Sequence, residues 1–370
     1  MKYKFFLICT PYLHDRGLKL NIESDIFFYL AKCFGQNSTD FETAKFHIKD
    51  TNQMTLDLEN LQDKLSQNTI VVVDGCYYPG DKTGIYPKEL TNTLEKSKAK
   101  IVCILSDLVK ELNFSPWVKI SNFILSFSKT GCEWANRYYN TNKFIHYPSI
   151  PVPCQNENNI QKFLNRPYDF GYVGSKKIFR MNFLNSFIKK SKKQISTMII
   201  DSNRSMETAS NTESYLKLLK QCRFFFCTRA AYYEKYSNSF LNSKIFDGRY
   251  AGRISESIAC GCIPIYWQPK RGGYLLTMLK NKIFFSRKSH LLNFECLKSD
   301  KESVPFDSID KKKINCVEFV NDADHAINLI KNYSIEDTKI KLENGLKFYS
   351  NYIDPKIFFD FILKNIEEKN

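Results

Sequence analysis

Short apolar runs recur along the chain, and segments long enough to form helices lie between them. The first series predicts strands at residues 5–9, 70–74, 101–106 and 123–127. A second series predicts strands at residues 169–174, 195–200, 223–227, 263–267, 282–285 and 316–320. Strands that are apolar on both faces and alternate with helices are typical of parallel sheets covered on each side. The pattern therefore predicts an α/β protein with two Rossmann-like halves.

A proline-rich polar segment separates the two series. Residues 148–159 hold three prolines followed by a run of mostly polar residues, a composition that disfavours regular structure. The predicted parts are an N-terminal domain over 1–150, a linker over 151–167, a C-terminal domain over 168–350, and a last helix over 351–370 that packs back toward the N-terminal domain. Pro355 is predicted to kink or split the helical pattern of residues 336–368. Two such halves place a ligand cleft between them, at the carboxyl ends of their strands.

Positive charge is concentrated in one part of the chain. Residues 161–290 hold 24 Lys and Arg against 7 Asp and Glu, whereas residues 1–160 hold 18 against 17. Such a field attracts phosphates of a small ligand, nucleic acid or an anionic membrane. A lysine-rich solvated surface is the alternative. Basic and aromatic residues from 187 to 193 could hold an anionic membrane, or they could be a solvated helix end.

The cysteines and the N-terminus place the chain in a broad class. Four cysteines lie in or beside apolar runs, which predicts buried thiols of a reducing compartment: Cys9, Cys103, Cys222 and Cys227. The close pair Cys260 and Cys262 lacks a second pair or a histidine, which disfavours zinc. The N-terminal apolar run is too short for a signal peptide, and no run of 18 or more apolar residues occurs. We therefore expect a cytoplasmic protein, with peripheral contact to the inner face of a membrane left open.

Two strand ends in the second half offer phosphate contacts. Residues 171–180 end a strand at Gly174 and Ser175 and enter a helix that carries Arg180. A glycine turn before a helix presents free N–H groups and the helix dipole to an anion, although an ordinary turn explains it as well. The strand at 223–227 leads to Arg229, which is a diphosphate contact or a surface arginine. Neither GxGxxG nor the P-loop pattern occurs.

The most informative segment is residues 248–267, which predicts a helix that begins at Gly252 and leads into a buried strand. Arg253 and Glu256 are three residues apart, so they share one helix face. The arginine can hold diphosphate oxygens with two hydrogen bonds, and the carboxylate can accept from both ribose hydroxyls. An ordinary Arg–Glu ion pair within the helix is the alternative.

This second half resembles the donor-binding half of GT-B glycosyltransferases. In that family a helix of the form Arg-x-x-Glu, followed by small residues, glycine and proline, precedes a strand, and Arg253, Glu256, Gly261 and Pro264 correspond. Exostosin-like transferases and GDP-fucose fucosyltransferases are the most similar branches, but the latter carry lysine where this chain has Ser257. The resemblance covers residues 169–350. It implies a GT-B fold, two Rossmann-like parallel-sheet domains facing a central cleft, with basic groups in place of a metal.

The predicted function is transfer of a sugar from a nucleotide sugar, linked to UDP or GDP, to a hydroxyl of a glycan, glycolipid or lipid-linked acceptor. No metal and no cofactor are expected, and neither is nucleic acid as a partner. The predicted donor-binding residues are Gly174, Ser175, Arg180, Arg229, Gly252, Arg253, Ser255 and Glu256. A nucleic-acid-binding module, with stacking aromatics at Tyr232, Tyr233, Tyr236 and Phe240, is one alternative. Another sugar-nucleotide enzyme of the same fold, such as an epimerase, is a second.

Carboxylates and a histidine supply the candidates for a metal or a base. Asp322 and Asp324 spell a DxD signature, but they are predicted to be a helix N-cap and a first-turn carboxylate. Candidates for the base that activates the acceptor hydroxyl follow strands of the first half: His14, Asp15, Glu23, Asp74 and Asp107, of which His14, Asp74 and Asp107 are the predicted catalytic residues. The two aspartates could equally be caps, and a lone histidine is often structural.

Overall fold

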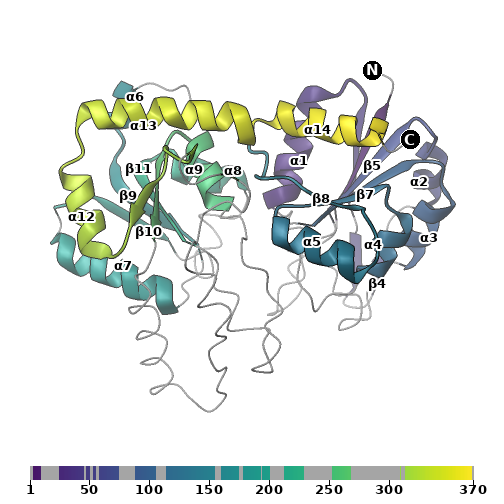
Figure 1. Ribbon diagram of the computed structural model, residues 1–370, viewed down its shortest axis with the longest axis horizontal. Helices are drawn as coiled ribbons and strands as arrows, with labels where there is room; N and C mark the ends of the chain where they lie inside the picture. The colour runs from purple at the N-terminus through teal and green to yellow at the C-terminus, as the bar shows by residue number, and fades with distance from the viewer. Residues whose placement is uncertain are drawn as a thin grey trace, which may run out of the picture. The chain divides into compact units, whose positions relative to one another are not determined.

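The computed structural model describes residues 3–9, 25–45, 47–50, 53–55, 58–74, 88–105, 114–154, 160–174, 178–192, 194–200, 212–228, 252–267, 309 and 313–368. The chain divides into two compact units (Figure 1). Unit 1 consists of residues 1–153 and 352–370, and unit 2 of residues 154–351. The predicted strand at residues 282–285 lies outside the described residues.

Unit 1 is built on a six-stranded sheet in which every neighbouring pair is parallel. Its strands, in spatial order, are β2 (Phe41–Lys45), β1 (Lys4–Cys9), β5 (Thr69–Asp74), β6 (Lys100–Leu105), β7 (Phe123–Ser126) and β8 (Phe144–His146). A separate antiparallel pair joins β3 (His47–Asp50) to β4 (Gln53–Thr55). The four strands predicted from apolar runs are confirmed. The edge strands β2 and β8 were missed, because one is mostly polar and the other has only three residues.

Helices cover both faces of this sheet. They are α1 (Asp25–Asn37), α2 (Leu58–Lys64), α3 (Lys88–Lys96), α4 (Ser115–Ile120), α5 (Lys129–Tyr138) and α14 (Pro355–Glu368). Phe5 of β1 packs on Phe34 of α1 and Phe359 of α14, with ring centroids 5.2 and 4.9 Å away. Phe6 points to the opposite face, where Lys64 of α2 lies over its ring. The last helix therefore belongs to the core of unit 1.

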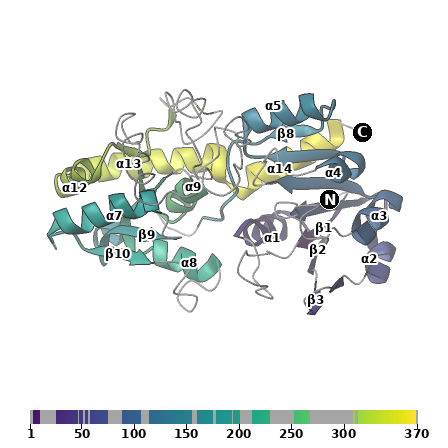
Figure 2. The ribbon, with the colours of Figure 1, turned by 90° about the horizontal axis from the view of Figure 1, so that it is seen from below.

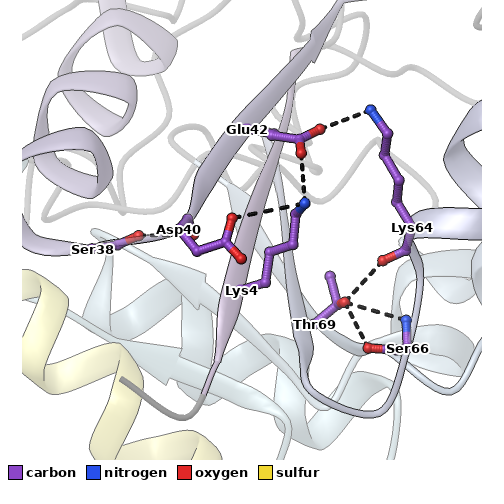
Figure 3. Close-up of polar contacts among 7 residues, drawn as sticks. All are labelled: Lys4, Ser38, Asp40, Glu42, Lys64, Ser66 and Thr69. Atoms are coloured by element: carbon purple, nitrogen blue, oxygen red, sulfur yellow. Dashed lines mark hydrogen bonds and ion pairs between the residues drawn. The ribbon is translucent and has the colours of Figure 1, made fainter.

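A charged cluster on unit 1 ties β1, β2 and α2 together (Figure 3). Lys4 Nζ donates to Glu42 Oε1 at 2.5 Å, and Lys64 Nζ donates to Glu42 Oε2 at 2.8 Å. Lys4 Nζ also lies 3.7 Å from Asp40 Oδ1. The hydrogen bonds from Lys4 and Lys64 hold the pKa of the Glu42 carboxyl below its usual value. Ion pairs between side chains therefore join the edge strand β2 to β1, in addition to the backbone pairing of the two strands.

Unit 2 contains a five-stranded sheet, again parallel throughout. In spatial order the strands are β10 (Thr197–Ile200), β9 (Tyr168–Val173), β11 (Cys222–Cys227), β12 (Ile263–Trp267) and β13 (Glu318–Val320). The chain runs outward in one direction from β9 to β10 and in the other from β11 onward. This reversal makes the gap between β9 and β11 the topological switch point, where open α/β sheets bind ligands beyond the carboxyl ends of their strands.

The helices of unit 2 also cover both faces of their sheet. They are α6 (Ile160–Leu164), α7 (Ile178–Ser191), α8 (Thr212–Leu219), α9 (Gly252–Ala259), α12 (Ala323–Lys331) and α13 (Ile335–Phe348). On one face α7 and α12 lie side by side (Figure 1, Figure 2), and Phe187 of α7 stacks on Phe170 of β9 at 4.0 Å. On the other face α8 and α9 pack on β11. The prediction of two parallel α/β sheets is confirmed.

One interruption of a helix follows from local sequence. The last helical pattern is interrupted by a π-helix at Tyr349–Ile353, and α14 begins at Pro355, so the predicted break is confirmed. Proline suits the first helical position because the N–H that it lacks would have no partner there. Helix α6 lies inside the range 151–167 that was predicted as a linker. Among the described helices, none combines the length and the apolar character needed to cross a membrane.

Candidate functional site

Helix α9 is a short helix with a defined end. It begins at Gly252 and stops where Gly261 takes the left-handed conformation, with φ of 65°. The N–H of Gly261 donates to the carbonyl of Ile258 at 2.9 Å, and that of Cys262 donates to the carbonyl of Ser257 at 2.8 Å. This pair of bonds is the Schellman motif, which glycine at this position favours. The predicted helix, glycine turn and strand over residues 252–267 are confirmed.

Arg166 holds the end of α9 against β11. One guanidinium nitrogen donates to the carbonyl of Cys222 at 2.7 Å and lies 3.3 Å from Cys262 Sγ. The other nitrogen donates to the carbonyl of Cys260 at 2.8 Å. The thiols of Cys260 and Cys262 are both buried. Each donates to a backbone carbonyl of α8, Cys260 to that of Leu216 and Cys262 to that of Leu219. The pair Cys260 and Cys262 therefore holds the end of α9 against α8. Together with Arg166, it gives α9 a fixed position beside β11 and β12.

The guanidinium of Arg253 lies against the glycine turn that follows β9. A Cβ atom added to Gly174 would lie 2.2 Å from Arg253 Nη2 and 3.0 Å from Arg253 Cζ. Gly174 has φ of 156°, a conformation that residues with a side chain rarely adopt. The guanidinium thus occupies the space that a side chain at Gly174 would take. Gly174 and Arg253, which belong to motifs far apart in the sequence, therefore meet at the switch point of the sheet.

Tyr172 contacts two of the three arginines that are predicted to bind the donor. The Arg253 guanidinium carbon is 5.4 Å from the centre of the Tyr172 ring, within the range of a cation–π contact. Arg180 Nη1 is 3.4 Å from the Tyr172 hydroxyl oxygen, and Arg180 itself is buried in the first turn of α7. Because both arginines contact one tyrosine at the end of β9, two positive charges converge on the switch point.

Glu256 turns toward α8. Its side chain is 7% exposed, and its Oε2 accepts a hydrogen bond of 2.7 Å from the Tyr215 hydroxyl. No ion pair joins Glu256 to Arg253, although both residues are among those the structure describes. The alternative of a simple Arg–Glu pair within α9 is therefore not what the structure shows.

Arg253 is a cation without an anion among the described residues. Its Nε is buried and has no hydrogen-bond partner there. Burial by itself lowers the pKa of Arg253, but Tyr215, Tyr172 and Glu256 together raise it more, so the guanidinium pKa lies above its usual value. The side chain is charged at every pH at which the protein folds. A half-buried guanidinium with unused donors is suited to an incoming oxyanion.

The remaining predicted residues differ in how the structure places them. Gly252 is the first residue of α9, and Ser255 is fully buried in the same helix. Asp74 is the last residue of β5 in unit 1, but its side chain is not among those described. Ser175, Arg229, His14 and Asp107 lie outside the described residues, as do Asp15, Glu23 and the aromatics at 232, 233, 236 and 240. These assignments stay predictions.

The DxD sequence forms a helix terminus. Asp322 is the N-cap of α12, and its Oδ1 accepts from the N–H of His325 at 2.9 Å. Asp324 lies in the first turn and forms an ion pair with Lys190 of α7. The prediction of a cap and a first-turn carboxylate is confirmed. Within the described part of the chain, no group of three or more histidine, cysteine, aspartate or glutamate side chains could hold a metal ion.

Solved structures resemble the chain at low sequence identity. Pneumococcal O-GlcNAc transferase GtfA, in complex with UDP and GlcNAc, is 12% identical, with a TM-score of 0.42 over 87% of this chain and 62% of that one. The chain thus spans less than two thirds of GtfA. WaaG, a glycosyltransferase involved in lipopolysaccharide biosynthesis, is 8% identical, with a TM-score of 0.43 over 97% of this chain and 99% of that one. Acinetobacter baumannii MurG is 7% identical, with a TM-score of 0.41 over 98% and 100%.

No protein-family model and no curated protein sequence matches the chain. The TM-scores stay below 0.5, so these likenesses do not identify its activity. What the site can do follows from its own residues.

Two tyrosines of the site were not predicted. Tyr172 lies inside the Gly-Tyr-Val-Gly segment, and strand alternation alone could have placed it on the face opposite Gly171 and Val173. Tyr215 lies in α8, where its neighbours Glu213 and Lys217 form an ordinary exposed ion pair. No sequence signal marks Tyr215 as a partner of Glu256, because the contact depends on how α8 packs beside α9.

Proposed function

We propose that the chain is a GT-B glycosyltransferase that moves a sugar from a nucleoside diphosphate sugar to a hydroxyl of a glycan, glycolipid or lipid-linked acceptor. The observation that carries the proposal is Arg253. It is a charged guanidinium against Gly174, at the switch point of a parallel sheet, without an ion-pair partner among the described residues. Open α/β sheets bind ligands at such a point. A diphosphate is the anion that this geometry suits best.

Each group in the site has a place in this reaction. Arg253, Arg180 and the first N–H groups of α9 and α7 are proposed to hold the diphosphate, and Glu256 is proposed to accept from the ribose hydroxyls. The acceptor oxygen attacks the anomeric carbon, the bond from that carbon to the diphosphate oxygen breaks, and the diphosphate leaves with the electron pair. Positive groups that contact this oxygen stabilise the developing charge. The acceptor proton passes to a base of unit 1, for which His14, Asp74 and Asp107 are the candidates.

The proposal includes independence from a divalent metal, with the arginines supplying the positive charge. The donor is a UDP- or GDP-sugar. The segment from Gly261 to Ile265 supports an exostosin-like donor half, and the segment from Ile263 to Trp267 supports a fucosyltransferase-like one. Transfer that continues in excess EDTA is the expected result. Loss of transfer in EDTA, restored by Mg²⁺ or Mn²⁺, would contradict metal independence while leaving the transferase proposal intact.

Binding of nucleotides tests the proposal directly. UDP and GDP are titrated into the protein by calorimetry and by thermal unfolding, and one of them is expected to bind and to raise the melting temperature. Arg253→Ala is expected to weaken that binding by roughly 10- to 150-fold, the effect of losing a hydrogen-bonded charge. Arg137→Ala, which removes an exposed arginine of α5 in unit 1, is the matched control and is expected to bind as the natural protein does. Absence of binding by both nucleotides at millimolar concentration would overturn the proposal.

A further inference from the structure

Tyr215 contacts the candidate site from a helix that the proposed reaction does not otherwise use. It lies in α8, and its hydroxyl donates to Glu256 Oε2 at 2.7 Å. Arg253 lies three residues before Glu256 on α9, and Tyr215 also raises its pKa. The Tyr215 hydroxyl thus contacts the group proposed for the ribose, one helical turn from the group proposed for the diphosphate.

Arg253 and Glu256 would by default attract each other. Residues three apart on a helix are neighbours, and opposite charges at that spacing form ion pairs. Partial burial strengthens the attraction, because the effective dielectric constant falls. In the structure the pair does not form, and the carboxylate, only 7% exposed, accepts from Tyr215 instead. A buried carboxylate needs a donor, and the tyrosine supplies one without bringing a positive charge.

We propose that Tyr215 is a positioning residue that holds Glu256 away from Arg253, so that the carboxylate stays available to ribose hydroxyls and the guanidinium to a diphosphate. This inference rests on the proposed function. An ionised carboxylate offers about four lone-pair sites, so Glu256 can accept from Tyr215 and from a ribose at the same time. Loss of the tyrosine hydroxyl removes one contact that opposes the attraction between the carboxylate and Arg253, and an ion pair between the two would make both groups less available.

The test compares Tyr215→Phe, Glu256→Gln and the double variant by calorimetry with UDP, GDP and their 2′-deoxy forms. The natural protein is expected to bind the ribonucleotide about tenfold more tightly than the deoxynucleotide, the effect of one hydrogen bond to a charged group. Tyr215→Phe is expected to lose most of this preference and to bind the ribonucleotide about tenfold more weakly. In the double variant the phenylalanine is expected to add little to the effect of Glu256→Gln, because a neutral amide does not pair with Arg253.

The chain offers a matched control in the same unit. Tyr333 donates to Glu318 Oε1 at 2.7 Å, the same chemical contact at the same distance. Glu318 belongs to the edge strand β13, which is two strands away from β11, so this contact lies away from the switch point between β9 and β11. Tyr333→Phe is expected to lower the melting temperature and to leave both nucleotide affinity and ribose preference unchanged.

The outcomes separate the inference from the proposed function. If neither the natural protein nor any variant binds a nucleotide, the proposed function fails. If the natural protein binds with a ribose preference that Tyr215→Phe retains, the role of Tyr215 is wrong and the nucleotide site stands. Binding without any ribose preference in the natural protein also overturns the role. Equal losses from Tyr215→Phe in the natural and the Glu256→Gln backgrounds would mean structural damage, and would likewise refute positioning through Glu256.

Discussion

Replacing Gly174 with alanine is expected to displace Arg253 without unfolding unit 2. The new Cβ atom would lie 2.2 Å from Arg253 Nη2 and 3.0 Å from the Tyr172 hydroxyl oxygen. Heavy atoms in comfortable contact are about 3.5 Å apart, so the guanidinium must withdraw by roughly 1 Å. The colliding atom is the end of a long flexible side chain, so rotation of that side chain relieves the clash more cheaply than movement of the backbone.

The expected magnitudes differ for binding and for stability. Loss of a charge-assisted contact to a diphosphate costs about 1.5–3 kcal/mol, which is roughly a 10- to 150-fold rise in Kd. Alanine at the φ of 156° observed for Gly174 is strained, and such strain costs about 1–3 kcal/mol of stability. A domain with a total stability of about 5–15 kcal/mol stays folded after that loss. Nucleotide affinity should therefore fall measurably while the protein stays folded.

Calorimetry with UDP and GDP measures the effect, and two further variants make it specific. Gly174→Ala combined with Arg253→Ala is expected to bind no more weakly than Arg253→Ala alone, because the displaced group is already absent. Gly171→Ala is the control with the opposite result: its Cβ would lie 2.3 Å from Cys222 Sγ and 2.9 Å from Cys222 Cβ, atoms at the root of a side chain on β11. It is expected to lower the melting temperature and to keep nucleotide affinity while folded.

Two results would refute this reasoning. Unchanged nucleotide affinity in Gly174→Ala would show that the position of the Arg253 guanidinium does not matter for the ligand. Equal weakening by Gly174→Ala with and without Arg253 would show that the glycine acts through the backbone of the turn alone.

Three further predictions concern the framework. Arg166→Leu leaves two backbone carbonyls of the α9 and β11 junction without their donor, so urea unfolding should show a loss of about 3 kcal/mol. Among the described cysteines, burial raises the pKa of Cys227 to about 12, whereas Cys154 is exposed. Iodoacetamide at neutral pH should therefore modify Cys154 first and Cys227 only after unfolding. Mass spectrometry of peptides measures which of the two is modified. The lowered pKa of Glu42 means that its ion cluster stabilises unit 1 above the ordinary carboxyl pKa and is lost as pH falls through the lowered value. Glu42→Gln should therefore reduce the pH dependence of unfolding in the acid range, by a small amount because the side chain is 38% exposed.

The architecture was largely predictable because fully buried parallel strands leave a strong local pattern. The segment Cys-Arg-Phe-Phe-Phe-Cys can bury its apolar side chains on both faces only between two layers of helices. It forms β11. Pro355 cannot continue a helix, and α14 begins at it. Strand β2, Phe-Glu-Thr-Ala-Lys, has no such pattern, because an edge strand contacts one neighbour and tolerates polar side chains.

The site was predictable in its residue types but not in their arrangement. Glycine, arginine and glutamate at the ends of strands and helices predicted a phosphate and ribose site, because few other side chains supply those charges and that backbone freedom. The separate motifs around Gly174 and Arg253 carried no sign that they meet. From the sequence alone, it also stayed open whether Arg253 and Glu256 form an ion pair with each other or contact separate groups.

The sequence by itself therefore determined the two sheets, the helix that begins at Gly252, and the identities of the charged groups, since local patterning and backbone chemistry specify these. Only the tertiary structure decided that Arg253 lies against Gly174, because parallel strands β9, β11 and β12 bring their carboxyl ends to one edge whatever their separation along the chain. It also decided that Glu256 accepts from Tyr215, since a buried carboxylate takes the donor that a neighbouring helix presents. Contacts between side chains on different elements depend on packing, which no single segment encodes.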